Sequence, residues 1–196
     1  MPVNRSVLAV IAAGVVVAAA AIAAVLYVMQ PAAVHEQAGP PSALAPFTLG
    51  AKPAAVPQVA IADASGARLS LASFKGKYVL LNLWATWCGP CVKELPALAK
   101  LKATAANKGF AVVAVDVGRN TTGEARTFLD THGAKVLDTY VDSNIALLRA
   151  FNAFGLPLTI LIDPTGKEIG RAVGPAQWDN PEAIAYFKSL TAPKPI

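Results

Sequence analysis

Both cysteines of the chain stand two residues apart in WATWCGPC, residues 84–91. The segment KYVLLNLW, which leads into it, is a near-continuous apolar run of strand length, as expected for a strand covered on both faces. After it, four apolar residues beginning at Cys91 recur at spacings of 4, 3 and 3, which marks one face of a helix. We therefore expect Cys88 at the start of a helix that directly follows a buried strand.

A helix start is a place where a cysteine becomes reactive. The unpaired amides and the helix dipole favour the thiolate, and such cysteines commonly have a pKa between about 3.5 and 7.5. Pro90 suits the first turn, because its missing N–H costs nothing there. Cys91 lies one turn further in, close enough to Cys88 for a disulfide but more shielded from solvent. The pattern favours a redox pair in which Cys88 attacks and Cys91 resolves.

Three other interpretations of the cysteines compete with a redox pair. A structural disulfide closing so short a loop would remove little chain entropy from the unfolded state, so it would stabilise the fold only weakly. A metal site would need more ligands, and neither His35 nor His132 has a ligand spacing. Inert buried cysteines would not need Gly89 and Pro90 between them. We expect neither a metal nor another cofactor.

An uncharged apolar run occupies residues 7–29, and about 20 such residues suffice to span a bilayer as a helix. We expect a transmembrane anchor, and a signal peptide, cleaved or uncleaved, is the alternative. Arg5 precedes the run and no Lys or Arg occurs in residues 30–51, so the short N-terminus, residues 1–6, should stay in the cytoplasm. The chain would then be a single-pass protein of a bacterial inner membrane, with its C-terminal part in the periplasm, a compartment that permits disulfides.

A tether and one folded domain are expected after the anchor. Residues 30–58 are rich in Pro and Ala without an apolar period, which favours an extended spacer. Residues 59–196 alternate short apolar runs with segments of helical period, in the order β-β-α-β-α-β-α-β-β-α. This order predicts an α/β domain with a mixed sheet and helices on both faces. We expect this domain to be a soluble monomer.

The composition limits the class of protein. The chain is 55% hydrophobic and only 15% charged, too apolar for a disordered protein. Its net charge of +5 suits a solvated surface near anionic lipid, and the sequence holds no nucleic-acid motif. We expect membrane association and no nucleic-acid binding.

Apolar spacing and turn residues place the individual elements of the domain. Strands are expected in a hairpin over 59–71 that turns at 65–66, at 77–84, at 111–117, at 136–141, and in a hairpin over 158–173 that turns at 163–166. Helices are expected at 122–132 and 145–154, with a last helix capped by Asn180 and buried through Ile184, Phe187 and Leu190.

A resemblance to a known family rests on three segments: NLWATWCGPCVKELPAL, GLPLTILIDPTGKEIGRAVGPAQW, and the additional helix and strand between residues 122 and 141. They resemble the thioredoxin-like proteins, in particular the membrane-anchored thiol-disulfide proteins of the TlpA, ResA and cytochrome-maturation type. GPAQW is most similar to TlpA. The resemblance covers about residues 59–190 and implies a thioredoxin fold with an N-terminal β-hairpin and a central helix–strand insert, preceded by one transmembrane helix.

The resemblance also implies further site residues. Pro157 matches the cis-proline whose loop lies against the two cysteines and binds the substrate chain, together with Leu156 and an exposed Trp87. Glu94 matches a glutamate that, in the ResA-like branch, helps to move protons near the buried thiol. A solvated carboxylate is the alternative for Glu94. Asn82 occupies the place of a buried aspartate of ordinary thioredoxins.

The activity that the resemblance implies is protein-disulfide reduction through CGPC. Gly89 and Pro90 match reducing thioredoxins, with potentials near about −270 mV, rather than oxidants near about −120 mV. The implied electron donor is a membrane thiol carrier of the CcdA or DsbD type. The implied substrates are apocytochrome c or copper-site assembly proteins of cytochrome oxidase. A periplasmic disulfide oxidase or isomerase, and a copper-binding assembly factor, are the alternatives.

Overall fold

A computed structural model describes residues 39–192. The expected cytoplasmic N-terminus, the expected anchor and the first part of the expected tether lie outside these residues. Among the residues described, no helix has the length and apolar character needed to cross a membrane. The anchor at residues 7–29 stays a prediction.

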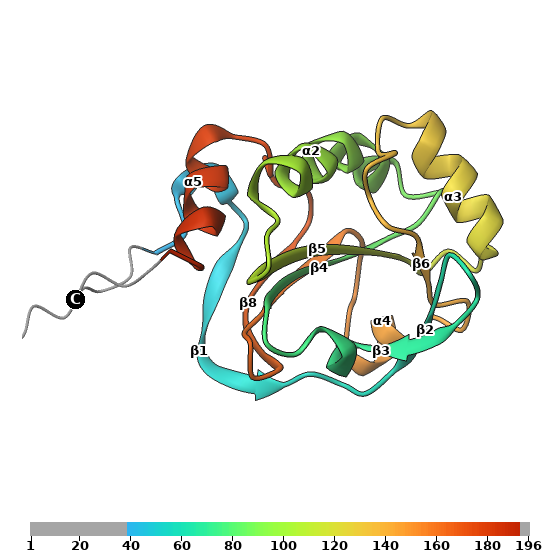
Figure 1. Cartoon of the computed structure of the whole chain (residues 1–196), viewed down its shortest axis with the longest axis horizontal. Helices are drawn as coiled ribbons and strands as arrows, with labels where there is room; N and C mark the ends of the chain where they lie inside the picture. Colours follow the sequence, from blue (N-terminus) through green and yellow to red (C-terminus); the bar gives the residue numbers. More distant parts are fainter. Residues whose placement is uncertain (1–38, 193–196) are drawn as a thin grey trace, which may run out of the picture. The chain divides into compact units, whose positions relative to one another are not determined.

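Eight strands form one mixed sheet, in the order β1-β8-β7-β4-β5-β6-β2-β3 (Figure 1). Their bounds are β1 Thr48–Ala55, β2 Ala60–Asp63, β3 Arg68–Ser70, β4 Tyr78–Trp84, β5 Phe110–Asp116, β6 Tyr140–Val141, β7 Leu158–Ile162 and β8 Lys167–Val173. Strands β4, β5 and β6 are parallel neighbours, whereas β7 pairs antiparallel with both β4 and β8. The sheet is mixed, as predicted.

Helices cover both faces of this sheet. They are α2 Gly89–Ala105, α3 Thr122–Thr131, α4 Ala146–Ala150 and α5 Pro181–Ser189, with the short 3-10 helices η1 Ser42–Leu44 and η2 Leu71–Phe74. Figure 1 shows α2 and α3 on one side of β4 and β5, and α4 on the other. The predicted cap at Asn180 is confirmed, since its side chain accepts a hydrogen bond from Glu182 N. The predicted α/β class, with a mixed sheet and helices on both of its faces, is confirmed for the domain.

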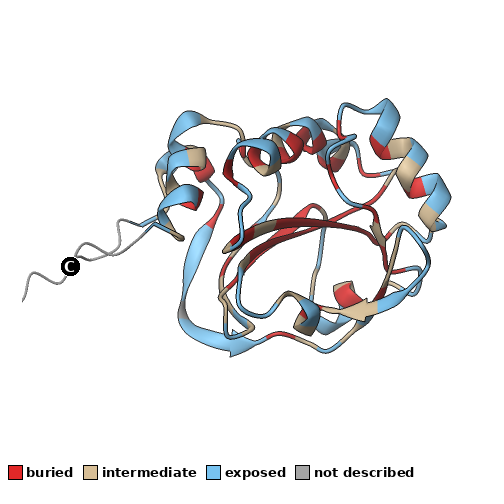
Figure 2. Ribbon diagram, in the orientation of Figure 1, coloured by how far each residue is buried: buried red, intermediate tan, exposed pale blue. Residues whose placement is uncertain are grey.

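Strand β4 is buried on both faces, as its near-continuous apolar run predicts (Figure 2). Leu80 and Trp84 pack in one core with residues of α2, α3 and α5, whereas Val79, Leu81 and Leu83 pack in the core on the opposite face. Side chains alternate between the faces of a strand, so a strand between two helical layers must be apolar at nearly every position. This burial fixes the strand that leads into the cysteines.

The apolar face predicted for the helix after the cysteines is also confirmed. Cys91, Leu95, Leu98 and Leu101 of α2 are all fully buried. The last helix follows its prediction in part: Phe187 of α5 is fully buried, whereas Ile184 and Leu190 are half-buried against the same core.

Both predicted hairpins are present. β2 pairs antiparallel with β3, and β7 with β8. Each turn contains a glycine in the left-handed region, Gly66 with φ +83° and Gly166 with φ +86°, where other L-residues are strained. Each turn is also held by an aspartate, Asp63 or Asp163, whose Oδ1 accepts backbone N–H groups two and four residues later.

The folded domain begins before residue 59, so the predicted tether is too long. Residues 48–55 form β1, which pairs antiparallel with β8. Leu44, Phe47 and Val56 are buried, and the Phe47 ring lies 6.3 Å from that of Trp178. Strand β1 lies at the edge of the sheet, where a proline such as Pro53 is tolerated. The Pro and Ala content of residues 48–55 therefore led to their assignment to the tether, although they form a strand.

Two elements are shorter than predicted. β6 contains two of the six residues expected, because the preceding segment turns instead: Leu137 N donates to Ala134 O, and the Leu137 carbonyl accepts from the Arg126 guanidinium. The helix predicted at 145–154 is reduced to the five residues of α4. Asn152 has a left-handed backbone with φ +51°, and Phe154 beyond it is fully exposed rather than part of the core.

Candidate active site

Cys88 and Cys91 form a disulfide at the N-terminus of α2. Cys88 is the N-cap residue, and its Sγ accepts a hydrogen bond from Cys91 N at 3.3 Å. Cys88 is 6% exposed and Cys91 is fully buried, which is the order of accessibility that the sequence predicts. Gly89 and Pro90 are exposed on the first turn. The backbone amides of this turn can therefore stabilise a thiolate at Cys88.

Trp87 precedes the disulfide and is 69% exposed. A large aromatic side chain held in solvent beside a reactive pair offers apolar contact area to another molecule. Trp84, three residues earlier, is fully buried. Trp87 is therefore exposed, as the resemblance implies, whereas Trp84 belongs to the core.

Pro157 lies at the end of the sheet where β4 ends and the loop with the cysteines begins. β7 begins at Leu158, which pairs with Leu83 near the end of β4. The Leu156–Pro157 peptide bond is cis, as the resemblance implies. Pro157 is buried and Leu156 is half-buried against both cores.

Glu94 is buried, with 4% of its surface exposed, so the alternative of a solvated carboxylate is wrong. Three groups donate to its carboxylate: Asn82 Nδ2 to Oε1 at 2.8 Å, Trp178 Nε1 to Oε2 at 2.9 Å, and Ala176 N to Oε2 at 3.4 Å. Burial raises the pKa of Glu94 from 4.5 to about 6, and the three donors offset the burial only in part. The carboxyl can thus gain or lose a proton near neutral pH.

Asn82 connects this carboxylate to the sheet. Its Nδ2 donates both to Glu94 and, at 2.9 Å, to Thr159 Oγ1 on the neighbouring strand β7. The residue at the place of the thioredoxin aspartate therefore holds a carboxylate from α2. Sequence reasoning missed Thr159 and Trp178 as partners. The available signals were a single polar residue within the apolar run LTILI, and the tryptophan of GPAQW.

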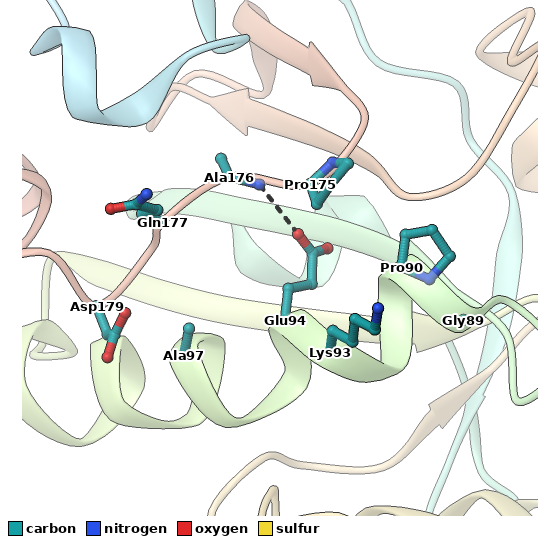
Figure 3. Close-up of a pocket in the computed structure, with 9 residues that line it drawn as sticks. All are labelled: Gly89, Pro90, Lys93, Glu94, Ala97, Pro175, Ala176, Gln177 and Asp179. Carbon is teal, nitrogen blue, oxygen red and sulfur yellow. Dashed lines mark hydrogen bonds between the residues drawn. The ribbon is translucent and has the colours of Figure 1, made fainter.

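A cleft of about 540 Å³ opens beside the first two turns of α2. Gly89, Pro90 and Glu94 of α2 contribute one side, and Pro175–Gln177 of the loop before α5 contribute the other. Figure 3 shows the Glu94 carboxylate facing Ala176 N across this space. The buried Glu94 and the turn between the two cysteines, Gly89 and Pro90, thus line the same cleft.

The one histidine in the described part of the chain, His132, does not join the cysteines. In the described part of the chain no three His, Cys, Asp or Glu side chains gather as a metal site requires. His132 stacks on Phe128 with ring centroids 3.8 Å apart, at the end of α3. His35 lies outside the described residues.

Comparisons with known proteins agree with this site. Residues 51–186 match the model of the Redoxin family. The thiol-disulfide oxidoreductase ResA of Bacillus subtilis (strain 168) is 35% identical over 118 residues, 60% of this chain and 65% of that protein. The chain thus spans just under two thirds of that relative. The ResA of Bacillus anthracis is 30% identical over 135 residues, 69% of this chain and 76% of that protein.

Solved structures show the same fold. A thiol:disulfide interchange protein of the thioredoxin family from Chlorobium tepidum TLS has 29% identity and a TM-score of 0.55, covering 70% of this chain and 99% of that one. The thioredoxin domain of a thiol-disulfide oxidoreductase from Bacteroides vulgatus has 24% identity and a TM-score of 0.60, covering 73% of this chain and 100% of that one. The fold is a thioredoxin fold, and the cysteine pair has the spacing and placement of a CXXC redox site.

Proposed function

The chain belongs to the Redoxin family, within its thioredoxin-like TlpA and ResA branch, and we propose that it is a thiol-disulfide oxidoreductase that reduces disulfides of other proteins. The observation that carries the proposal is the position of Cys88 at the N-cap of α2, with Cys91 buried behind it. The helix start favours a thiolate at the accessible position, and the second thiol is within disulfide distance.

The reduction proceeds by two exchanges. The Cys88 thiolate attacks one sulfur of the substrate disulfide, so a mixed disulfide forms and the other substrate sulfur leaves as a thiolate. The Cys91 thiolate then attacks Cys88 Sγ, which forms the Cys88–Cys91 disulfide and releases the second substrate thiol. The substrate gains two electrons and this chain loses them, so a dithiol donor must reduce the pair again.

Glu94 is proposed as the group that takes the proton from Cys91. The two residues are three positions apart on α2, and such residues are neighbours on a helix. A carboxyl group with a pKa of about 6 is ionised often enough at neutral pH to accept a proton. In the structure described, with the disulfide formed, the carboxylate is held by Asn82, Ala176 and Trp178.

The substrate is proposed to dock on exposed apolar side chains near the disulfide. Trp87 adjoins Cys88, and Phe154, fully exposed, lies three residues before Pro157. Together with Leu156, they suit an extended, partly apolar segment around a substrate cysteine.

The cellular setting is part of the proposal. Residues 7–29 would tether the domain to the inner membrane with the active site in the periplasm, which the uncharged apolar run supports. The proposed donor is a membrane dithiol carrier of the CcdA or DsbD type. The proposed substrates are apocytochrome c or copper-site assembly proteins, as the resemblance to the TlpA and ResA branch suggests.

Reduction of insulin by dithiothreitol, with and without catalytic amounts of the protein, tests the activity. The proposal requires that the protein accelerate the reduction. A protein that instead accelerates only the oxidation of a reduced, unfolded dithiol protein would be an oxidase. Stoichiometric copper bound through both thiols, without exchange activity, would favour the assembly factor.

Trp87→Ala should lower kcat/KM for insulin about three- to tenfold, because an exposed aromatic contact contributes about 0.5–1.5 kcal/mol beyond the area it buries. The reaction with a small aromatic disulfide, 5,5′-dithiobis(2-nitrobenzoate), should change less than twofold, since little contact area is involved. The matched control is Leu49→Ala, which removes an exposed apolar side chain on β1. Equal losses for both disulfides would argue against a docking role of Trp87.

A further inference from the structure

The loop that follows β5 packs closely on the loop that carries Cys88. Val117 N donates to Trp84 O at 2.8 Å, which joins the two loops at their bases. A Cβ added at Gly118 would stand 3.2 Å from Ala85 Cβ and 2.8 Å from Asp116 Oδ1, so little room remains between them. Arg119, the next residue, has a left-handed backbone with φ +69°. Such a conformation persists in a non-glycine residue only where the surroundings hold it.

A buried carboxylate organises this contact. Asp116, at the end of β5, is fully buried. Its Oδ1 accepts from Gly118 N at 2.5 Å and its Oδ2 from Asn120 Nδ2 at 2.6 Å. Burial raises the pKa of Asp116, and the hydrogen bonds from Asn120 and Gly118 oppose the rise. Burying an acid without such partners would be costly, so the two bonds fix the loop around it.

The same asparagine reaches the active-site loop. Asn120 Nδ2 also donates to Thr86 Oγ1 at 3.3 Å. Thr86 is the second residue before Cys88, and Cys88 N in turn donates to Ala85 O at 3.0 Å. A continuous chain of hydrogen bonds thus runs from a buried side chain of β5 to the turn that presents the attacking sulfur.

We propose that Asp116, Asn120 and Thr86 are positioning residues that hold the loop of Cys88 at the start of α2. The proposal rests on the proposed function, because it concerns the reactivity of the attacking thiol. The thiolate is favoured only while Cys88 occupies the N-cap, where its Sγ receives Cys91 N–H. Loosening the loop weakens that bond for part of the time, which raises the pKa of the Cys88 thiol toward its usual range and slows its attack.

Thr86→Val and Asn120→Ala test the proposal, each in the reduced protein with Cys91→Ser so that only one thiol reacts. The rate of alkylation of Cys88 by iodoacetamide at pH 6 should fall about three- to tenfold, because this factor corresponds to the net free energy of one hydrogen bond. The whole pH profile of alkylation should move to higher pH. The double variant should lose no more than the more affected single variant, since both changes break one connection.

Thr104→Val is the matched control, because it removes a hydrogen-bonded threonine near the far end of α2. Its alkylation profile should equal that of the parent. A merely structural role predicts lowered thermal stability with unmoved profiles, and that result would overturn the proposal. Additive losses in the double variant would also overturn it. Thr86 is half-buried, so Thr86→Val should fold.

Failure of this inference and failure of the proposed function give different results. If the protein with both cysteines reduces insulin and the Thr86 and Asn120 variants keep the parent profile, only the positioning role is wrong. If the profiles move as expected but that protein reduces no protein disulfide, the positioning role holds and the proposed activity is wrong.

Discussion

Cys88→Ser should abolish reduction of a protein disulfide, and Cys91→Ser should accumulate mixed disulfides through Cys88. Serine cannot form the mixed disulfide, so the first exchange is lost altogether. Without Cys91 the first exchange still occurs, but no second thiol of this chain resolves the mixed disulfide. Turnover of insulin should fall to the uncatalysed rate in both variants, and non-reducing electrophoresis with mass spectrometry should show adducts only for Cys91→Ser.

Both replacements are close in size to the original side chain, so a fold unchanged by circular dichroism is the control. Exposure supports the assignment of roles, since Cys88 is 6% exposed and Cys91 is fully buried. Alkylation of the reduced protein at mildly acidic pH that labelled Cys91 before Cys88 would reverse the two roles.

The free energy of unfolding of the parent should fall by about 2 kcal/mol as the pH rises through about 6, and Glu94→Gln should remove this fall. The folded protein raises the pKa of Glu94 from 4.5 to about 6, so the folded state holds this proton more tightly than the unfolded state does. The stabilisation is complete below pH 4.5 and is lost as the pH rises through about 6, which corresponds to about 2 kcal/mol. Urea unfolding of the parent and the variant between pH 4 and pH 7 measures the difference.

The glutamine should fit without loss of the fold. Its oxygen can keep the bond from Trp178 Nε1, while its amide nitrogen would face Asn82. The Oδ1 atom of Asn82 is buried without a hydrogen-bond partner in the described structure. If the Asn82 side-chain amide flips, so that Oδ1 and Nδ2 exchange places, Oδ1 can accept a hydrogen bond from the amide nitrogen of the new glutamine. The Thr159 hydroxyl could then donate to the turned amide.

Glu124→Gln is the control for that experiment. Hydrogen bonds from Thr121 lower the pKa of Glu124, so its contribution is present at higher pH and is lost as the pH falls. The two variants should therefore change the pH dependence in opposite senses. A parallel pH dependence of the parent and Glu94→Gln would show that burial does not raise the pKa of Glu94. The rate at which Cys91 resolves the mixed disulfide can be measured separately. If this rate has the same pH profile in Glu94→Gln as in the parent, Glu94 is not the proton acceptor of Cys91.

Local patterns predicted most of the elements that position the site. A near-continuous apolar run predicted β4, and apolar spacing predicted the buried face of α2. Together they predict a helix start at Cys88, and Cys88 is the N-cap residue of α2. Such patterns work because each follows from the period of one element packed between two layers.

Patterns failed where contacts between distant segments decide the structure. Strand β1 exists because its backbone pairs with β8 and Phe47 packs on Trp178, neither of which shows in a Pro- and Ala-rich segment. The partners of Glu94 are 12 residues away at Asn82 and 84 residues away at Trp178. Periodicity carries no information about such pairs. The connection from Asp116 to Thr86 was missed for the same reason.

The equilibrium reduction potential of the Cys88–Cys91 pair tests the central claim most directly. The pure domain, equilibrated with defined mixtures of reduced and oxidised dithiothreitol, is quenched with acid and its free thiols are counted by mass after alkylation. Gly89 and Pro90 between the cysteines, and a thiolate stabilised mainly by a helix start, predict a reducing couple near the thioredoxin value of about −270 mV. A potential above about −150 mV would place the protein among the oxidants and contradict its role as a reductant.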